Sequence, residues 1–203
     1  MKRIPIGIKD YPKIIEEDYY FVDKTLLIKE FIDRGNEVTL ITRPRRFGKT
    51  LNMSMMAEFF DITKDSKEIF KGTKIMETKY ASYLNQYPVI YLSFAGAKGS
   101  KDDMVEIIKQ NLFMLYSKHD FVFSDLNDYE NTIYQGIKYH LSQFYTGSFK
   151  GINNSLSFLM EQMQKYYNKK VMVFIDEYDT PFIEAHAGGF YDDIRQSLSS
   201  LLH

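Results

Sequence analysis

The sequence of 203 residues contains no cysteine and no long apolar run. The lack of cysteine excludes disulfide bonds, thiolate metal sites and a cysteine nucleophile, and it fits a reducing compartment. No stretch approaches the ~20 apolar residues that a membrane span needs, and the N-terminus lacks the apolar run of a signal peptide. We therefore expect a cytoplasmic protein that makes no contact with a membrane.

An excess of charge of one sign is also missing. The chain carries 26 Lys and Arg against 27 Asp and Glu, a net charge of -1, so nothing in the composition drives it toward nucleic acid or an anionic membrane. Apolar residues make up 44% and aromatic residues 16% of the chain, which is typical of a folded globule. The length suits one α/β domain over residues 1–203.

The stretch that organises the chain is Val38 to Ser54, V-T-L-I-T-R-P-R-R-F-G-K-T-L-N-M-S. Residues 38–42 are β-branched or aliphatic and predict a buried strand, which breaks at Arg43-Pro44 into a loop. The loop ends at Gly48-Lys49-Thr50, and a helical pattern follows at once. Strand, loop, Gly-Lys-Thr and helix in this order are typical of a P-loop that binds phosphates.

Each residue of the loop has a role in this interpretation. Gly48 lets the backbone approach the phosphates, Lys49 places a positive charge at the β- and γ-phosphate oxygens, and the Thr50 hydroxyl binds Mg²⁺. The motif is incomplete, because Arg43 stands where the first glycine of a P-loop belongs. On this motif alone, an ordinary turn that opens a helix is an equally good interpretation.

A second segment favours the P-loop. Residues 171–178, V-M-V-F-I-D-E-Y, form an apolar strand that ends in two acids, which is the Walker B pattern. A parallel strand would deliver Asp176 to the carboxyl edge of the sheet, where it would hold Mg²⁺, and Glu177 would deprotonate an attacking water. The alternative for this segment by itself is a core strand followed by a solvated acidic turn.

Three motifs resemble a known family. They are R-P-R-R-F-G-K-T-L at residues 43–51, F-V-D-K-T at 21–25 and F-I-D-E-Y-D-T-P at 174–181, and the chain is similar over nearly its whole length to the predicted AAA-ATPase-like family. The resemblance implies that arginine is normal at the first glycine position and that Glu177 is an additional catalytic glutamate. It also implies a nuclease-like C-terminal effector domain, absent from these residues, through which alone the protein would contact nucleic acid.

These patterns predict a site for ATP and Mg²⁺. The predicted nucleotide-binding residues follow one another through the loop and the first helical turn: Arg45, Arg46, Phe47, Gly48, Lys49, Thr50 and Leu51. Lys49 and Glu177 are the predicted catalytic residues, and Thr50 and Asp176 are the predicted metal ligands. One of the two arginines would bind phosphate oxygens through its guanidinium group, or both would instead form salt bridges to the acidic turn.

The rest of the chain predicts a three-layer P-loop NTPase with a mostly parallel sheet. An N-terminal arm and a helix over 24–34, capped by Asp23 and ended by Gly35, occupy residues 1–36. By resemblance the Asp23 turn would contact the nucleotide, or it would only cap the helix. A second strand is expected over 89–94, and three helices fill a helical insertion over about 101–168, which is either a partner-binding lid or a plain helical layer.

The last predicted helix, over about 190–202, runs to the final residue. ATPases with an extra catalytic glutamate place a further strand, carrying a polar sensor residue, after this helix. We therefore expect the sequence to be truncated at its C-terminus, and we expect hydrolysis by this fragment alone to be slow or absent. The sequence leaves the oligomeric state open.

Two functions are consistent with these patterns. The first is an ATPase that hydrolyses ATP with Mg²⁺ to regulate an attached or partner effector. The second is a nucleotide-sensing or degenerate interaction module that binds ATP or ADP with little turnover. A kinase for a small acceptor is less favoured, because the Asp-Glu pair suits water as the acceptor.

Overall fold

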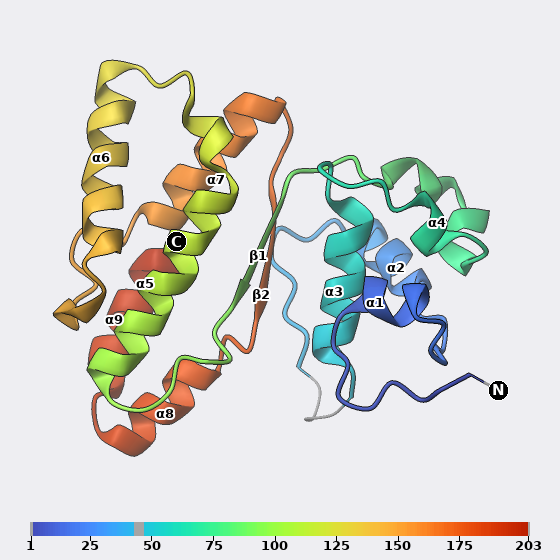
Figure 1. Ribbon diagram of the computed structural model, residues 1–203, viewed down its shortest axis with the longest axis horizontal. Helices are drawn as coiled ribbons and strands as arrows, with labels where there is room; N and C mark the ends of the chain where they lie inside the picture. The colour runs from blue at the N-terminus through green and yellow to red at the C-terminus, as the bar shows by residue number, and fades with distance from the viewer. Residues whose placement is uncertain (1, 43–46, 203) are drawn as a thin grey trace. The chain divides into compact units, whose positions relative to one another are not determined.

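The chain folds into two compact units, Met1–Val89 and Ile90–His203, in a computed structural model. The structure describes residues 2–42 and 47–202, so the predicted phosphate-binding residues Arg45 and Arg46 lie outside the described residues. Figure 1 colours the first unit from blue to green and the second from green to red. The single domain over 1–203 that the sequence suggests stays a prediction.

Short helices build the first unit. Its α-helices are α1 (Tyr11–Glu16), α2 (Leu26–Arg34), α3 (Lys49–Phe60) and α4 (Lys67–Phe70), and its 3₁₀ turns are η1 (Lys74–Glu77) and η2 (Lys79–Tyr83). Helix α1 packs against α3 and α4, and α2 packs against η1 (Figure 1). The helix predicted over 24–34 is confirmed with a start at Leu26, and Gly35 ends it in the left-handed conformation at φ 57°. The predicted cap by Asp23 is wrong, because Thr25 is the N-cap residue and no described side chain caps the helix.

Aromatic side chains form the core of this unit. The Phe59 ring on α3 lies 5.2 Å from the ring of Phe70, edge to face, and the Tyr11 ring lies 5.2 Å from Phe70 as well. All three side chains are fully buried. Such pairs contribute about 0.5–1.5 kcal/mol each beyond the burial of their surface. The C-terminal half of α3 is thereby fixed in the core, which holds the direction of the whole helix.

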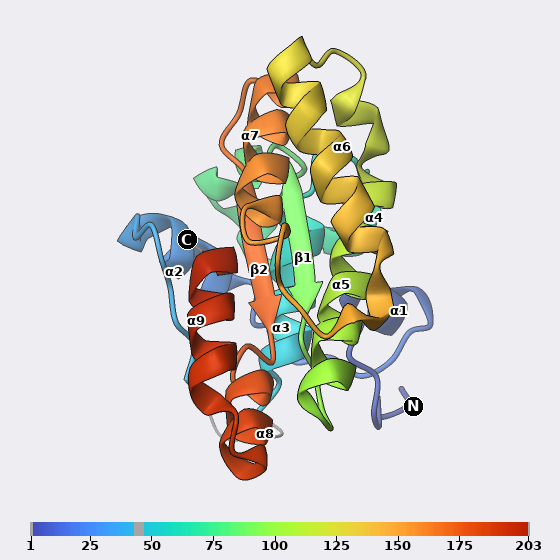
Figure 2. The ribbon, with the colours of Figure 1, turned by 90° about the vertical axis from the view of Figure 1, so that its left-hand side faces the viewer.

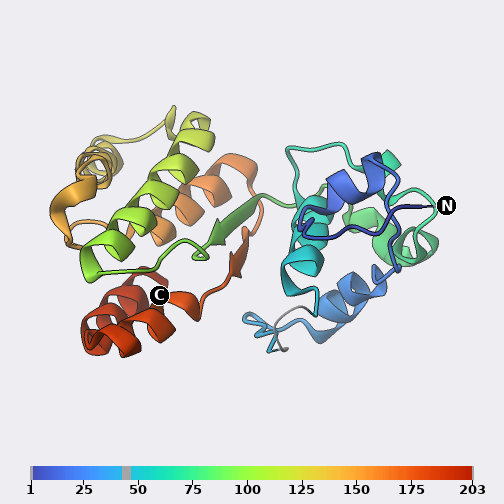
Figure 3. The ribbon, with the colours of Figure 1, turned by 60° about the horizontal axis from the view of Figure 1, so that its bottom comes forward.

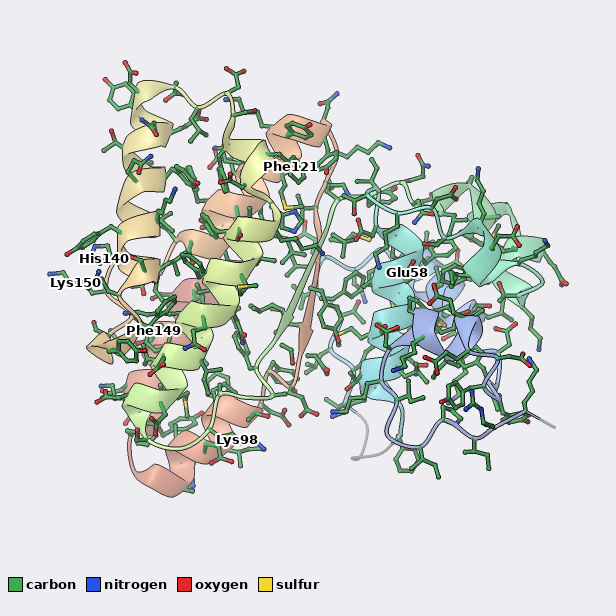
Figure 4. The ribbon with its side chains drawn as sticks, viewed as in Figure 1. Glu58, Lys98, Phe121, His140, Phe149 and Lys150 are labelled. Atoms are coloured by element: carbon green, nitrogen blue, oxygen red, sulfur yellow. The ribbon has the colours of Figure 1, made fainter. Side chains whose placement is uncertain are left out.

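A buried acid fixes the same end of α3 (Figure 4). Glu58 accepts a hydrogen bond of 2.6 Å from Ser66 Oγ and forms an ion pair with Lys64. The Asn85 side-chain amide donates to the backbone carbonyl of Glu58 at 3.2 Å. A buried carboxylate without such partners would destabilise the fold, so this network is a condition for placing glutamate inside the unit.

The strand predicted over 38–42 is wrong in this structure. These residues carry no strand assignment, and the side chains of Val38 and Leu40 are 84% and 62% exposed. A strand exists only through hydrogen bonds to a neighbouring strand, and the described residues of the sheet are limited to two other segments. Strand-forming side chains alone do not make a strand when no neighbouring strand is available.

The sheet consists of β1 (Val89–Ser93) and β2 (Met172–Asp176). The strands run parallel, since both arrows in Figure 2 point the same way. The backbone N–H of Phe94 donates to the carbonyl of Asp176 at 3.0 Å, so the carboxyl ends of the two strands lie together. Both strands were predicted from their apolar runs, and both predictions are confirmed.

Helices also surround the strands of the second unit (Figure 3). They are α5 (Lys101–Lys118), α6 (Asp128–Ser142), α7 (Ser155–Tyr167), α8 (Thr180–Gly188) and α9 (Tyr191–Leu202), with 3₁₀ turns η3 (Asp120–Phe123) and η4 (Phe144–Thr146). Capping boxes open α5 at Ser100 and α6 at Asn127. The three helices predicted within 101–168 are confirmed, whereas their status as an insertion stays a prediction.

One face of the sheet carries the core of this unit. Ile90, Leu92 and Phe94 of the first strand segment and Val173 and Ile175 of the second pack among apolar side chains of the helices. Side chains alternate between the two faces of a strand. Tyr91, Phe174 and Asp176 therefore project from the opposite face. The structure is α/β with a small parallel sheet, compatible with a P-loop fold, and the predicted three layers remain a prediction.

Candidate functional site

Helix α3 begins at the predicted phosphate-binding residues with an open N-terminus. Gly48 is its N-cap, in the left-handed conformation at φ 75° and ψ 23°, and no described side chain caps the helix. A Cβ placed on Gly48 would meet nothing within 4 Å. The first N–H groups of an α-helix have no acceptor within the helix, and they lie at the positive end of its dipole, which suits an anion.

The other predicted phosphate-binding residues continue from this point. Lys49, Thr50 and Leu51 form the first turn of α3 and are half-buried, and Phe47 just before it is exposed. The hydroxyl of Thr50 is an oxygen donor of the kind that Mg²⁺ binds. Phe47 through Leu51 thus lie at the start of one helix, and their contact with phosphates stays a prediction.

The acidic turn lies at the carboxyl end of β2. Asp176 is the last residue of the strand, and its side chain is buried at 6% exposure. The backbone N–H of Glu177 donates to Asp176 Oδ1 at 3.0 Å, and the Tyr91 hydroxyl on β1 donates to Oδ2 at 3.4 Å. Both carboxylate oxygens are therefore oriented by the protein.

Glu177 has a special backbone conformation. Its φ of 51° is in the left-handed region, which costs a residue with a Cβ about 1–2 kcal/mol. The conformation reverses the chain directly after the strand, and the Thr180 N–H then donates to the Glu177 carbonyl at 3.0 Å as α8 begins. Non-glycine residues held in this way cluster at active sites, so the strain itself marks Glu177 as a candidate.

The donor set suits a metal that is shared with phosphates. Among the ranges 2–42 and 47–202, no group of three or more His, Asp or Glu side chains lies together as a metal site. In P-loop proteins Mg²⁺ is held by one hydroxyl, one carboxylate, waters and the phosphates themselves. In the first unit Thr50 carries a hydroxyl, and in the second unit Asp176 carries a carboxylate.

The F-V-D-K-T motif has a structural role. Asp23 Oδ1 accepts from the N–H and the hydroxyl of Thr25 at 2.8 and 2.7 Å, and Oδ2 accepts from the N–H of Lys74 at 2.8 Å. The buried Thr25 hydroxyl in turn accepts from the Ile75 N–H at 3.1 Å. Burial raises the pKa of Asp23, but the hydrogen bonds from Lys74 and Thr25 outweigh this effect and hold the pKa below its usual value.

Two residues near the sheet edge were not assigned a firm role from the sequence. Lys98 is exposed on the connection that follows β1 (Figure 4). Tyr91 is the residue that sequence reasoning missed. The alternation of β1, which turns Tyr91 to the same face as Asp176 on the neighbouring strand, is the signal that would have found it.

An α/β fold with a Gly-Lys-Thr helix start and an Asp-Glu turn after a parallel strand is compatible with the class of P-loop nucleotide-binding proteins. A family model described as "Predicted AAA-ATPase" matches residues 5–203. The chain belongs to this family, whose description indicates a nucleotide-binding ATPase.

Comparison with curated proteins gives one informative relative. The chain is 28% identical over 185 residues to a protein of Azotobacter chroococcum mcd 1 described as "Uncharacterized protein in vnfD 5'region". The match covers 90% of this chain and 30% of that protein, so the chain spans less than a third of the relative's length. No solved structure matches the chain. No helix in the described ranges is long and apolar enough to cross a membrane.

Proposed function

We propose that this chain is an ATP-binding P-loop ATPase domain that hydrolyses ATP with Mg²⁺ and thereby regulates an attached or partner effector. Its membership of the predicted AAA-ATPase family supports the nucleotide and the reaction. The observation that carries the proposal is the start of α3, where Gly48-Lys49-Thr50 opens a helix with an open N-terminus and a left-handed glycine cap.

In the first unit, the residues of the helix start bind the phosphates. The backbone N–H groups of the first turn donate to phosphate oxygens, and the Lys49 ammonium group neutralises part of the negative charge. The Thr50 hydroxyl ligates the metal. Arg45 and Arg46 are proposed phosphate contacts by sequence alone.

In the second unit, the residues of the acidic turn bind the metal and activate the attacking water. The Asp176 carboxylate, oriented by the Glu177 N–H and the Tyr91 hydroxyl, holds the metal or its water shell. The Glu177 carboxylate accepts a proton from the attacking water. ATP supplies the phosphoryl group, and Mg²⁺ neutralises the charge of its oxygens.

The effector is the part of the proposal that rests on resemblance. The A. chroococcum relative is more than three times as long as the matched region, since the match covers 30% of it. We propose that ATP turnover controls a further domain or a partner, and the resemblance of the sequence to the family suggests a nuclease-like one. Any contact with nucleic acid would then belong to that effector.

Nucleotide binding by calorimetry tests the first half of the proposal. ATP and GTP are titrated with Mg²⁺ into the wild-type chain and into Lys49→Ala and Lys67→Ala. Loss of a charge-assisted contact weakens ATP binding by about 10- to 100-fold in Lys49→Ala. Lys67 is the matched control, because it is also the first residue of a helix in the same unit but lies outside the motif. Equal ATP affinity in wild type and Lys49→Ala would refute the phosphate site.

Phosphate release tests the second half, in the natural polypeptide that contains this chain. Glu177→Gln keeps the size of the side chain and removes the base. If the protein is an ATPase, Glu177→Gln lowers the turnover of ATP by about 10²- to 10⁴-fold and leaves the affinity for ATP unchanged. A nucleotide-sensing module shows the same low turnover in both forms, and that result would replace hydrolysis with binding alone as the function.

A further inference from the structure

The carboxyl ends of β1 and β2 form a fixed frame around Asp176. The Phe94 N–H donates to the Asp176 carbonyl at 3.0 Å, which locks the register of the two strands. On the other side of β1, the Asn111 side-chain amide on α5 donates to the Ser93 carbonyl at 2.9 Å. Phe94 itself is fully buried in the core of the unit. The end of β1 is therefore tied both to β2 and to the helical layer.

Within this frame, Tyr91 reaches the acidic turn from the neighbouring strand. Its hydroxyl donates to Asp176 Oδ2 at 3.4 Å, while the Glu177 N–H donates to Oδ1 at 3.0 Å. One donor lies on β1 and the other in the turn directly after β2, and they bind different oxygens of the carboxylate. Together they restrict the rotation of the carboxylate about its last torsion, which is otherwise broad.

The chemistry of the carboxylate leaves room for a metal. Each carboxylate oxygen has two acceptor positions, so one hydrogen bond per oxygen leaves a position on each for a metal or a metal-bound water. The Tyr91 hydroxyl is neutral, and it therefore orients Asp176 without competing with the cation for its charge. A lysine at this place would reduce the attraction of the carboxylate for a cation.

We propose that Tyr91 is a positioning residue for Asp176, setting the orientation in which that carboxylate accepts a divalent cation. The inference deepens the proposed function and rests on Asp176 being a metal ligand. Removing an outer partner of a ligand typically costs 10- to 100-fold in metal affinity. The hydrogen bond from Tyr91 to Asp176 is long, at 3.4 Å. We therefore expect a loss of metal affinity at the lower end of this range, about tenfold.

A Mg²⁺ titration of ATP binding separates orientation from packing. Tyr91→Phe keeps the ring and removes only the hydroxyl. The Mg²⁺ concentration that gives half of the full ATP affinity rises about tenfold, while ATP affinity in EDTA is unchanged. An unchanged Mg²⁺ requirement overturns the inference, and so does an equal loss of affinity in EDTA, because that would be a packing effect.

Tyr116→Phe is the matched control. Its buried hydroxyl donates to the Ser155 carbonyl at 2.7 Å in the same unit, remote in sequence from Asp176. This variant lowers the melting temperature by removing a buried hydrogen bond and leaves the Mg²⁺ requirement of ATP binding unchanged. A Mg²⁺ shift in both variants would assign the effect to general loosening of the unit and overturn the role of Tyr91.

A second readout works without nucleotide. Mn²⁺ is titrated into wild type and Tyr91→Phe, and broadening of the Phe94 and Glu177 amide signals in NMR spectra reports binding at the acidic turn. We expect tenfold weaker Mn²⁺ binding in Tyr91→Phe. If wild type bound Mn²⁺ here but no ATP, the proposed ATPase would fail and Tyr91 would keep its role. Equal broadening in wild type and Tyr91→Phe, or no broadening in wild type, would overturn the role of Tyr91 and would not affect the proposed ATPase.

Discussion

The acidic turn after β2 and the Gly-Lys-Thr helix start are built in different ways. The acidic turn follows a strand that is paired, and both oxygens of Asp176 have hydrogen-bond donors. The Gly-Lys-Thr helix start follows a segment, residues 38–42, that has the side chains of a strand and no strand partner. The helix itself is fixed from its other end, through Phe59 and Glu58 in the core.

The difference shows which part of the phosphate-binding motif depends only on residues that are neighbours in the sequence. A left-handed glycine before a helix is a local backbone feature, and the helix that follows it here is stabilised by the packing of its C-terminal half. A buried strand depends on a neighbour elsewhere in the chain, and no composition of the strand itself can supply that neighbour. The helix half of the phosphate-binding motif is therefore present where the strand half is not.

The largest predicted effect compares two leucines from the two predicted strands. Leu92 on β1 is 2% exposed and Leu40 is 62% exposed. Leu92→Ala leaves a cavity in the core and lowers the free energy of unfolding by about 3 kcal/mol. Leu40→Ala removes little buried surface and changes it by less than about 0.5 kcal/mol. Urea denaturation followed by circular dichroism measures both.

The two leucine variants also give the result that would contradict the difference between residues 38–42 and β1. If Leu40→Ala were as costly as Leu92→Ala, residues 38–42 would be a paired and buried strand in solution. The sequence-based prediction for that segment would then be right. Leu202, on the last turn of α9 and also partly exposed, offers a third leucine whose replacement by alanine calibrates the cost of a surface position.

A double-mutant cycle tests whether Thr50 and Asp176, the two proposed metal ligands, bind one ion. Thr50→Ala and Asp176→Asn each weaken Mg²⁺-dependent ATP binding by about 10- to 100-fold, because each removes an oxygen ligand. Calorimetry in Mg²⁺ and in EDTA measures the effect. If one ion uses both residues, the double variant loses less than the sum, with a coupling of about 0.5–3 kcal/mol. Additive losses would mean that the residues serve different sites.

The fold was predictable from the sequence where an apolar pattern belongs to a segment that packs or pairs with another described segment. The three helices within 101–168 and the strands β1 and β2 lie within a few residues of their predicted places, because long apolar periodicity and clear caps decide them. The segment 38–42 fails, since its pairing is a property of the whole sheet. The division of the chain into two units has no marked linker in the sequence, so composition gave no sign of it.

The site residues remain predictions of the sequence, and the structure adds the backbone conformations and contacts around them. Gly48 in a left-handed N-cap is as the motif requires. The left-handed Glu177 was not foreseen, because glutamate has no preference for that conformation and only the turn after β2 imposes it. The network of Asp23 with Lys74 joins residues 51 apart in sequence, and such a contact has no local signal.

The Asp23 network gives a pH-dependent prediction for the first unit. The pKa of Asp23 is lowered in the folded state, so its contribution to stability is full above the unfolded pKa and is lost as the pH falls from about 5. Asp23→Asn costs about 2 kcal/mol at pH 7, since one acceptor becomes a donor facing an N–H. Urea denaturation at pH 7 and pH 3 measures both forms.

The difference between wild type and Asp23→Asn should shrink at pH 3. Asp65, an exposed aspartate of the same unit, is the control, and Asp65→Asn changes stability little at either pH. A gap between wild type and Asp23→Asn that stayed constant with pH would mean that the hydrogen bonds of Asp23 do not depend on its charge. The motif F-V-D-K-T would then stabilise the unit by shape alone.

The smallest predicted effect concerns the strained backbone of the acidic turn. Glu177→Gly relieves a left-handed residue at φ 51° and raises the free energy of unfolding by about 0.5–1 kcal/mol, after the entropy cost of glycine is subtracted. Asn168, at φ 50° at the end of α7, is the matched control, and Asn168→Gly gains less because asparagine tolerates this conformation. Urea denaturation measures both variants. A gain in stability together with a loss of phosphate release would show that the acidic turn is kept strained for its carboxylate, whereas destabilisation would show that the side chain of Glu177 holds the turn together.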